Sequence, residues 1–119
     1  MKMPKTKQSE NEVKKAVTTF LSFNGYEIIR INNVGIWNET KKCHIFHGTP
    51  GVADLYAVKP GDYPLWIETK ATGKKPTDDQ NEFGSKVNKT FGTFWIWCDS
   101  LDMFITEFNK IMGVKGECE

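Results

Sequence analysis

A tight turn between two strand-like runs constrains the fold of this chain more than any other feature. Residues 53–58 and 65–70 carry mostly apolar and aromatic side chains, and Lys59-Pro60-Gly61-Asp62 lies between them. Proline fixes its own φ and glycine adopts a positive φ without strain, so this composition favours a chain reversal. The pattern predicts a β-hairpin in the middle of the chain.

Helical and strand patterns continue on both sides of this hairpin. Ser9 with Glu12, and Thr77 with Gln80, have the spacing of a capping box, which marks the start of a helix. The periodicity of apolar residues then predicts the following elements: a helix from 10 to about 23, strands over 26–31, 53–58 and 65–70, a helix from 78 to about 90, a strand over 93–98, and a last helix that begins after Asp99 or Ser100.

The predicted fold class is therefore α/β, with a mixed central sheet flanked by helices in the order αβββαβα. Residues 32–51 lack a clear period and are interpreted as a long loop, with room for a short strand near Cys43–Phe46. A length of 119 residues with 39% hydrophobic content suits one domain with one core. We expect that domain at 9–112, between a flexible N-terminal segment (1–8) and a polar C-terminal tail (113–119).

Composition excludes several classes of protein. A net charge of +1 gives no strong electrostatic signature of nucleic-acid binding, although an acidic metal site would offset basic surface elsewhere. Three cysteines without paired spacing, no signal-like segment and no apolar run of membrane length indicate a cytoplasmic protein. Cys43, His44 and His47 lack a second ligand pair at metal spacing, so zinc is not favoured.

The second strand of the hairpin carries the chemistry. Side chains two residues apart in a strand project from the same face, so Glu68 and Lys70 lie side by side. The hairpin also brings Asp54 of the preceding strand beside Glu68. Two carboxylates with open positions suit Mg²⁺, which polarises a phosphodiester and acidifies its bound water. A lysine beside them can position that water or stabilise phosphoryl oxygens.

Taken alone, the Glu68-x-Lys70 pair is better explained as an exposed same-face pair on an edge strand, because this short pattern is common. The wider pattern comprises Gly48-Thr-Pro-Gly51-Val-Ala-Asp54-Leu-Tyr, then Trp66-Ile-Glu68-Thr-Lys70-Ala, then Gln80. This spaced set resembles the VRR-NUC family of the PD-(D/E)xK nuclease superfamily, which includes enzymes similar to Holliday-junction resolvases. The resemblance covers roughly residues 10–98.

The resemblance implies a restriction-endonuclease-like core that binds Mg²⁺ or Mn²⁺. Asp54 and Glu68 match the metal-binding carboxylates, the backbone carbonyl of Thr69 matches a further ligand, and Lys70 matches the catalytic lysine. Gln80 matches the glutamine of the following helix, although its place in the capping box with Thr77 explains it equally well. Ala53 stands where the family usually has proline, which shapes the backbone but supplies no ligand.

The family also has a glutamate on its first helix. Glu10 fits this role best because it precedes Val13 and Val17 by three and seven residues, whereas Glu12 suits the capping box. Candidates for phosphate contact are Arg30, Asn32, Lys74 and Lys75, with solvated surface positions as the alternative.

These features lead to three functional hypotheses. The preferred one is a Mg²⁺- or Mn²⁺-dependent endonuclease that cuts DNA, including branched DNA such as four-way junctions, as a homodimer. The second is a catalytically inactive nucleic-acid-binding module, which would bind DNA in a salt-dependent way without cutting it. The third is an interaction or inhibitor protein that uses the fold as a scaffold and shows neither property.

Overall fold

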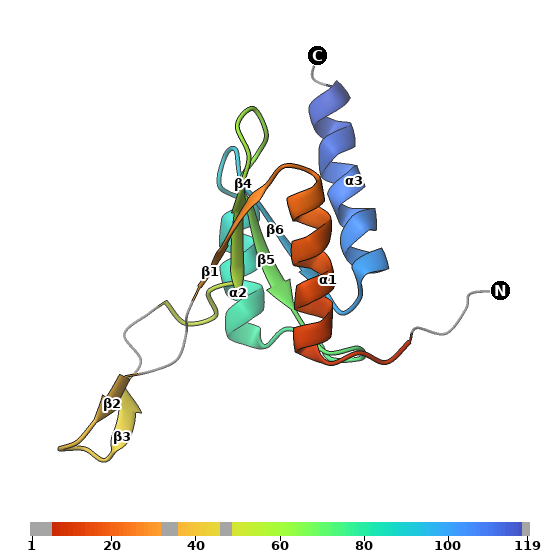
Figure 1. Cartoon of the computed structure of the whole chain (residues 1–119). Coiled ribbons are helices and arrows are strands. Elements are labelled where there is room, and N and C mark those ends of the chain that lie inside the picture. The colour runs from red at the N-terminus through yellow and green to blue at the C-terminus, as the bar shows by residue number, and fades with distance from the viewer. Residues whose placement is uncertain (1–5, 32–35, 46–48, 118–119) are drawn as a thin grey trace.

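The structure is a computed structural model that describes residues 6–31, 36–45 and 49–117 (Figure 1). Its main sheet has four strands in the order β1-β4-β5-β6. The strands are β1 (Glu27–Arg30), β4 (Leu55–Val58), β5 (Leu65–Thr69) and β6 (Phe94–Cys98). Antiparallel pairing joins β1 to β4 and β4 to β5, whereas β5 and β6 are parallel. The sheet is therefore mixed, and the hairpin predicted around residues 59–62 is confirmed.

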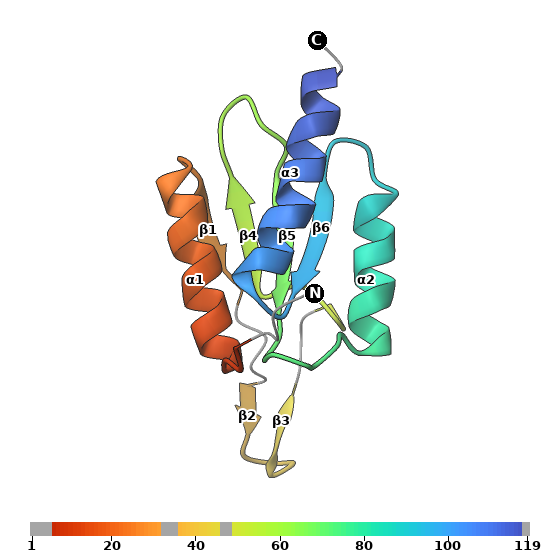
Figure 2. The same ribbon diagram turned by 90° about the vertical axis from the view of Figure 1, so that its right-hand side faces the viewer.

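Three helices complete the architecture: α1 (Glu10–Phe23), α2 (Asp78–Asn88) and α3 (Leu101–Glu117). The two views show α1 and α3 together on one side of the sheet and α2 on the other side (Figures 1 and 2). The predicted class, a mixed sheet flanked by helices, is confirmed.

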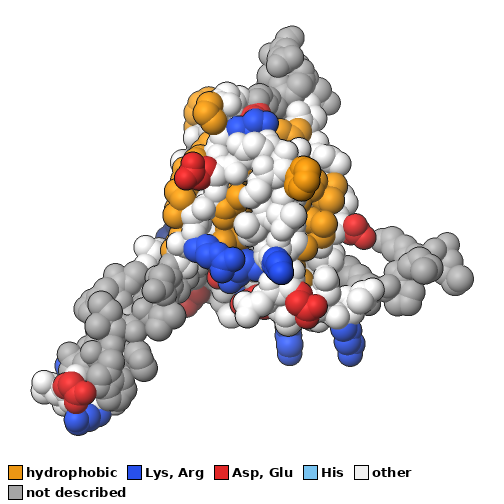
Figure 3. All heavy atoms as spheres, in the orientation of Figure 1, with side chains coloured by type: hydrophobic (Ala, Val, Ile, Leu, Met, Phe, Trp, Pro, Cys, Tyr) orange, Lys and Arg blue, Asp and Glu red, His pale blue; other side chains and the backbone are white. Residues whose placement is uncertain are grey.

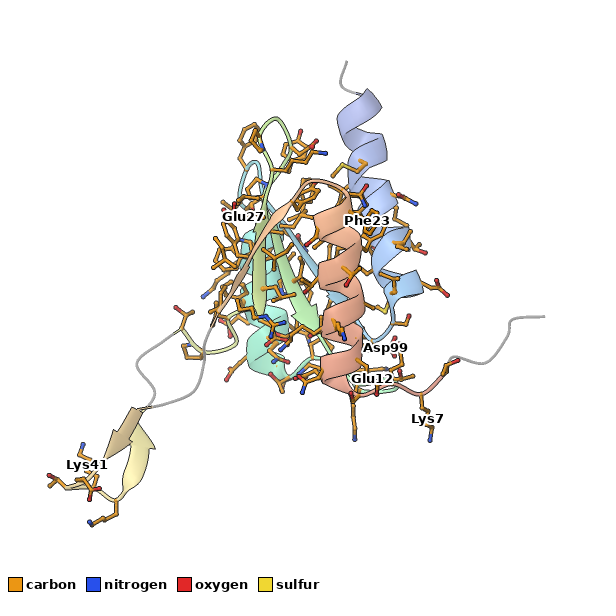
Figure 4. The ribbon with its side chains drawn as sticks, in the orientation of Figure 1. Lys7, Glu12, Phe23, Glu27, Lys41 and Asp99 are labelled. Atoms are coloured by element: carbon orange, nitrogen blue, oxygen red, sulfur yellow. The ribbon has the colours of Figure 1, made fainter. Side chains whose placement is uncertain are left out.

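The predicted element order αβββαβα is wrong, because two further strands lie within the region interpreted as a loop. These are β2 (Ile36–Asn38) and β3 (Cys43–Ile45), which pair with each other in a separate two-stranded sheet. Strand β3 is the short strand predicted near Cys43–Phe46, whereas β2 was not predicted. Strands this short give no readable alternation, and their turn contains no glycine: Lys42 itself takes the positive φ of 53°. The hairpin projects away from the main body, with Lys41 labelled near its tip (Figures 1 and 4).

The core lies between the sheet and the pair α1 and α3. Val13, Val17 and Leu21 are fully buried at the helical spacing that the sequence predicts, and they pack with the inward side chains of β4 and β5. Phe20 of α1 meets Phe108 of α3 edge-on, with ring centroids 5.3 Å apart. This contact fixes α1 to α3, and α1 carries one side of the candidate site.

On the opposite side, α2 packs closely on β5 and β6. Phe83 meets Trp66 edge-on at 5.3 Å between ring centroids. Gly84 is buried, and a Cβ atom there would overlap the ring of Trp95. Glycine at position 84 therefore allows the helix to lie close to the sheet despite its helix-weakening propensity.

Helix α3 continues to Glu117, past residue 112 where the sequence predicts the domain to end. Gly113 and Gly116 each weaken a helix by about 1 kcal/mol relative to alanine, and residues 113–119 contain no proline that would end it. Among the described residues, no helix has both the length and the apolar character needed to span a membrane.

Candidate metal centre

Three carboxylates from three separate elements meet at one end of the sheet. Glu10 begins α1, Asp54 directly precedes β4, and Glu68 lies in β5. One carboxylate oxygen from each lies within 4.8 Å of the others. The structure therefore brings together the three acidic residues that the sequence singles out as metal ligands.

The hairpin register places Asp54 beside Glu68. Leu55 pairs with Ile67, so the next antiparallel pair along the ladder is Asp54 with Glu68. The carbonyl of Asp54 accepts a hydrogen bond from Ile31 N at 2.8 Å, which ties its backbone to the end of β1. Its side chain is held from the other direction, because Oδ2 accepts hydrogen bonds from the N–H of Thr69 at 3.2 Å and from its hydroxyl at 3.1 Å.

The start of α1 distinguishes Glu10 from Glu12. Ser9 and Glu12 form the predicted capping box: Glu12 Oε1 accepts from Ser9 N at 3.1 Å, and Ser9 Oγ accepts from Glu12 N at 3.2 Å. The backbone N–H of Ser9, and then its side chain, hold the pKa of Glu12 below its usual value. Figure 4 labels Glu12 at this end of the helix. Glu12 is thus engaged in capping, and Glu10 is the α1 residue that faces the acidic cluster.

Glu68 is the buried member of the cluster, with 1% of its surface exposed. Burial raises the pKa of Glu68 to about 9. A hydrogen bond that the protonated carboxyl donates to Asp54, and charge repulsion from Asp54 and Glu10, act in the same direction, whereas the charge of Lys70 lowers the pKa. The Oε1 atom of Glu68 has no hydrogen-bond partner although it is buried. A buried carboxylate oxygen without a partner is costly unless something else binds it.

Two lysines approach the carboxylates from different elements. Lys70 Nζ lies 3.9 Å from Glu68 Oε2, as the strand alternation predicts. Lys14 Nζ of α1 lies 3.9 Å from Asp54 Oδ2, which the sequence does not predict. The available signal was its position four residues after Glu10, since residues i and i+4 share a helix face.

A hydrogen-bond network anchors the segment that follows Lys70. The hydroxyl of Thr72 donates to the carbonyl of Asp99 at 3.2 Å, and the Asp99 side chain accepts from Gly73 N at 3.0 Å. The backbone N–H and carbonyl of Gln8 both bond to Thr72, at 3.0 Å each. These contacts tie the segment before Glu10 to the segment after Lys70, so the two sides of the site are held together. Asp99, predicted as a possible helix cap, has this anchoring role, and Ser100 caps α3 by accepting from Met103 N.

Gly51 lies in the turn that leads to Asp54, and it allows this turn to pack closely on α2. It has φ +75°, and a Cβ atom there would overlap the carbonyl of Asp79 and lie 2.7 Å from Gln80 N. The turn that leads to Asp54 therefore packs directly on the first turn of α2.

Gly51→Ala is expected to destabilise the protein more than Gly61→Ala does. Gly61 also has a positive φ, of +84°, but open space surrounds its Cβ position. Both variants lose about 1–2 kcal/mol because alanine is strained at a positive φ. Only Gly51→Ala loses about 1–3 kcal/mol more, because its Cβ atom overlaps neighbouring atoms. Urea unfolding of both variants measures the difference, and equal losses of stability would contradict the close packing of this turn on α2.

The structure places the remaining candidates outside the carboxylate cluster. Gln80 completes the capping box of α2, where its Oε1 accepts from Thr77 N at 2.8 Å, so the capping interpretation is confirmed and a role toward substrate stays a prediction. Arg30 is exposed at the end of β1, and Lys74 and Lys75 are exposed between β5 and α2. Asn32 and His47 lie outside the described residues.

The donor set fits a hard divalent cation. Three carboxylate oxygens converge, Oε1 of Glu68 is buried without a partner, and the neighbouring Thr69 is completely buried at the same strand end. Mg²⁺ and Mn²⁺ take oxygen ligands of this kind and keep water on their remaining positions. Metal ligation by the Thr69 carbonyl stays a prediction.

Comparisons with protein-family models, curated proteins and solved structures find no match to this chain. The assignment of a function therefore depends on the geometry of the site and on the sequence pattern.

Proposed function

We propose that this protein is a Mg²⁺- or Mn²⁺-dependent endonuclease that hydrolyses phosphodiester bonds in DNA, with a restriction-endonuclease-like fold of the VRR-NUC type. The observation that supports it best is the convergence of Glu10, Asp54 and Glu68, with a buried Glu68 oxygen lacking a partner and with Lys70 3.9 Å from Glu68. An ion pair of structural value alone would not need two further carboxylates beside it, because like charges repel one another.

Each residue has a distinct part in the proposed reaction. Glu10, Asp54 and Glu68 would hold the cation, and Thr69 keeps Asp54 in place through its two hydrogen bonds. The bound cation would supply an acidified water and polarise the phosphodiester. Lys70 lies at the edge of the cluster with 14% of its side chain exposed, so it can orient the attacking water and stabilise charge on the phosphoryl oxygens.

The surface around the site supports a nucleic-acid substrate. In Figure 3, several Lys and Arg side chains, with Asp and Glu side chains among them, lie over the lower part of the body, the region where Figure 1 places the N-terminal end of α1 and the C-terminal end of β5. Basic side chains beside an acidic metal centre suit a phosphate backbone better than a neutral substrate. The proposal includes branched DNA, since a homodimer would present two sites to two strands.

DNA cleavage tests this proposal directly. Linear, flapped and four-way-junction DNAs are incubated with wild type, Lys70→Ala and the control Lys110→Ala, each with Mg²⁺, Mn²⁺ or EDTA. Lys110 is an exposed α3 residue paired with Glu107, so its variant should cut like wild type. We expect metal-dependent cleavage that EDTA stops and that Lys70→Ala slows by about 10²–10⁴-fold, the usual contribution of a positioned acid–base group. Binding without cleavage under either metal would contradict the proposal and favour an inactive DNA-binding module.

A further inference from the structure

We infer that Lys14 is a second phosphate-binding residue of the site, which contacts the DNA phosphodiester from α1 while Lys70 approaches from the position directly after β5. This inference rests on the proposed nuclease function and adds a substrate-binding residue to it.

The contact of Lys14 with Asp54 is not needed to hold Asp54. The 3.9 Å between Lys14 Nζ and Asp54 Oδ2 is longer than a hydrogen bond, and the same Oδ2 already accepts two hydrogen bonds from Thr69. Lys14 keeps 18% of its side chain exposed, so the side chain is only partly covered by its neighbours beside Asp54.

The charge of the site supports a role toward an anion. With every ligand carboxylate ionised, as metal binding requires, three negative charges are balanced by a divalent cation and Lys70. Lys14 adds the one positive charge that gives the loaded site a net attraction for a phosphodiester, which carries one negative charge. Without Lys14, the loaded site would have no net charge to retain the substrate.

A lysine side chain can move from the Asp54 carboxylate to the phosphate of a bound substrate. Its ammonium group carries three donors on a flexible four-carbon stem. A cation bound to Asp54 would repel the Lys14 ammonium group, which could then pair with the phosphate of the substrate. Because Glu10 lies one helical turn before Lys14, the same helix presents a metal ligand and a phosphate contact together.

The test compares Lys14→Ala and Lys14→Arg with Lys15→Ala, a change at the exposed neighbouring position of the same helix. Three quantities are measured: Mn²⁺ affinity by titration calorimetry, and the KM and kcat of Mn²⁺-dependent DNA cleavage at several salt concentrations. Lys14→Ala is expected to raise the KM for DNA by about tenfold and to make the slope of log(1/KM) against log salt concentration shallower by about one. The Mn²⁺ affinity of Lys14→Ala should equal or exceed that of wild type. Lys14→Arg should have a KM close to the wild-type value, and Lys15→Ala should match wild type in KM and in Mn²⁺ affinity.

Two outcomes would overturn the inference alone. If Lys14→Ala weakens Mn²⁺ binding as much as it raises KM, Lys14 is a structural partner of Asp54. If Lys14→Ala and Lys15→Ala have the same KM, Lys14 does not contact the substrate. Failure of the nuclease proposal looks different, because wild type itself would then cut no DNA, and the inference would fall with it.

Discussion

Glu68→Gln is expected to cut DNA at least about a thousandfold more slowly than wild type under saturating Mn²⁺. The substitution keeps the size of the side chain but removes the charge of the most buried ligand, which has 1% of its surface exposed. An amide oxygen binds a hard cation less well than a carboxylate, and the cation loses the position beside Lys70. Single-turnover cleavage of an end-labelled DNA measures the loss.

The matched control is Glu82→Gln, the same chemical change at an exposed α2 residue that pairs with Lys86. It should cut at the wild-type rate. A Glu68→Gln rate within about tenfold of wild type would mean that Glu68 does not hold the catalytic cation.

The same Glu68→Gln variant is expected to be more stable than wild type without metal. Glu68 has a pKa of about 9 in the folded protein, against 4.5 when it is free of its surroundings. Between these values the folded state must take up a proton that the unfolded state does not hold, so wild-type stability is complete below pH 4.5 and falls as pH rises toward 9. Glutamine resembles the protonated glutamate and avoids this loss.

The three pH units between the free pKa of 4.5 and about pH 7.5 correspond to a gain on the order of 4 kcal/mol, which raises the melting temperature by roughly 15 °C. Thermal unfolding in EDTA at several pH values measures it, and the two curves should converge near pH 4.5, the ordinary pKa of the group. Equal pH dependence of wild type and variant would show that Glu68 is not the group held neutral by burial. With added Mn²⁺, wild type should have the higher melting temperature of the two proteins, because the cation stabilises only the protein that can bind it.

The capping boxes and the central hairpin were predictable because their signals are local. Ser9 with Glu12 and Thr77 with Gln80 satisfy the first backbone N–H groups of their helices within four residues. The turn at residues 59–62 needs only its own proline and glycine. Once the hairpin register is set, the meeting of Asp54 with Glu68 follows from the pairing of adjacent strands.

Other features were not predictable because they depend on contacts between distant segments. Lys14 and Asp54 are forty residues apart in sequence, and only the packing of α1 against the sheet brings them together. The anchoring of Gln8 by Thr72 is similarly distant, and it has no sequence signature. A short strand near Cys43–Phe46 was predicted, and β3 lies there, but β2 and its pairing with β3 were missed because strands this short show no period.

Anomalous diffraction from crystals grown with Mn²⁺ tests most directly the central claim that Glu10, Asp54 and Glu68 hold a divalent cation. We expect an anomalous peak at this cluster, about 2.0–2.3 Å from carboxylate oxygens of Asp54 and Glu68, and no such peak in Glu68→Gln crystals. A wild-type crystal in saturating Mn²⁺ without a peak at these residues would contradict it.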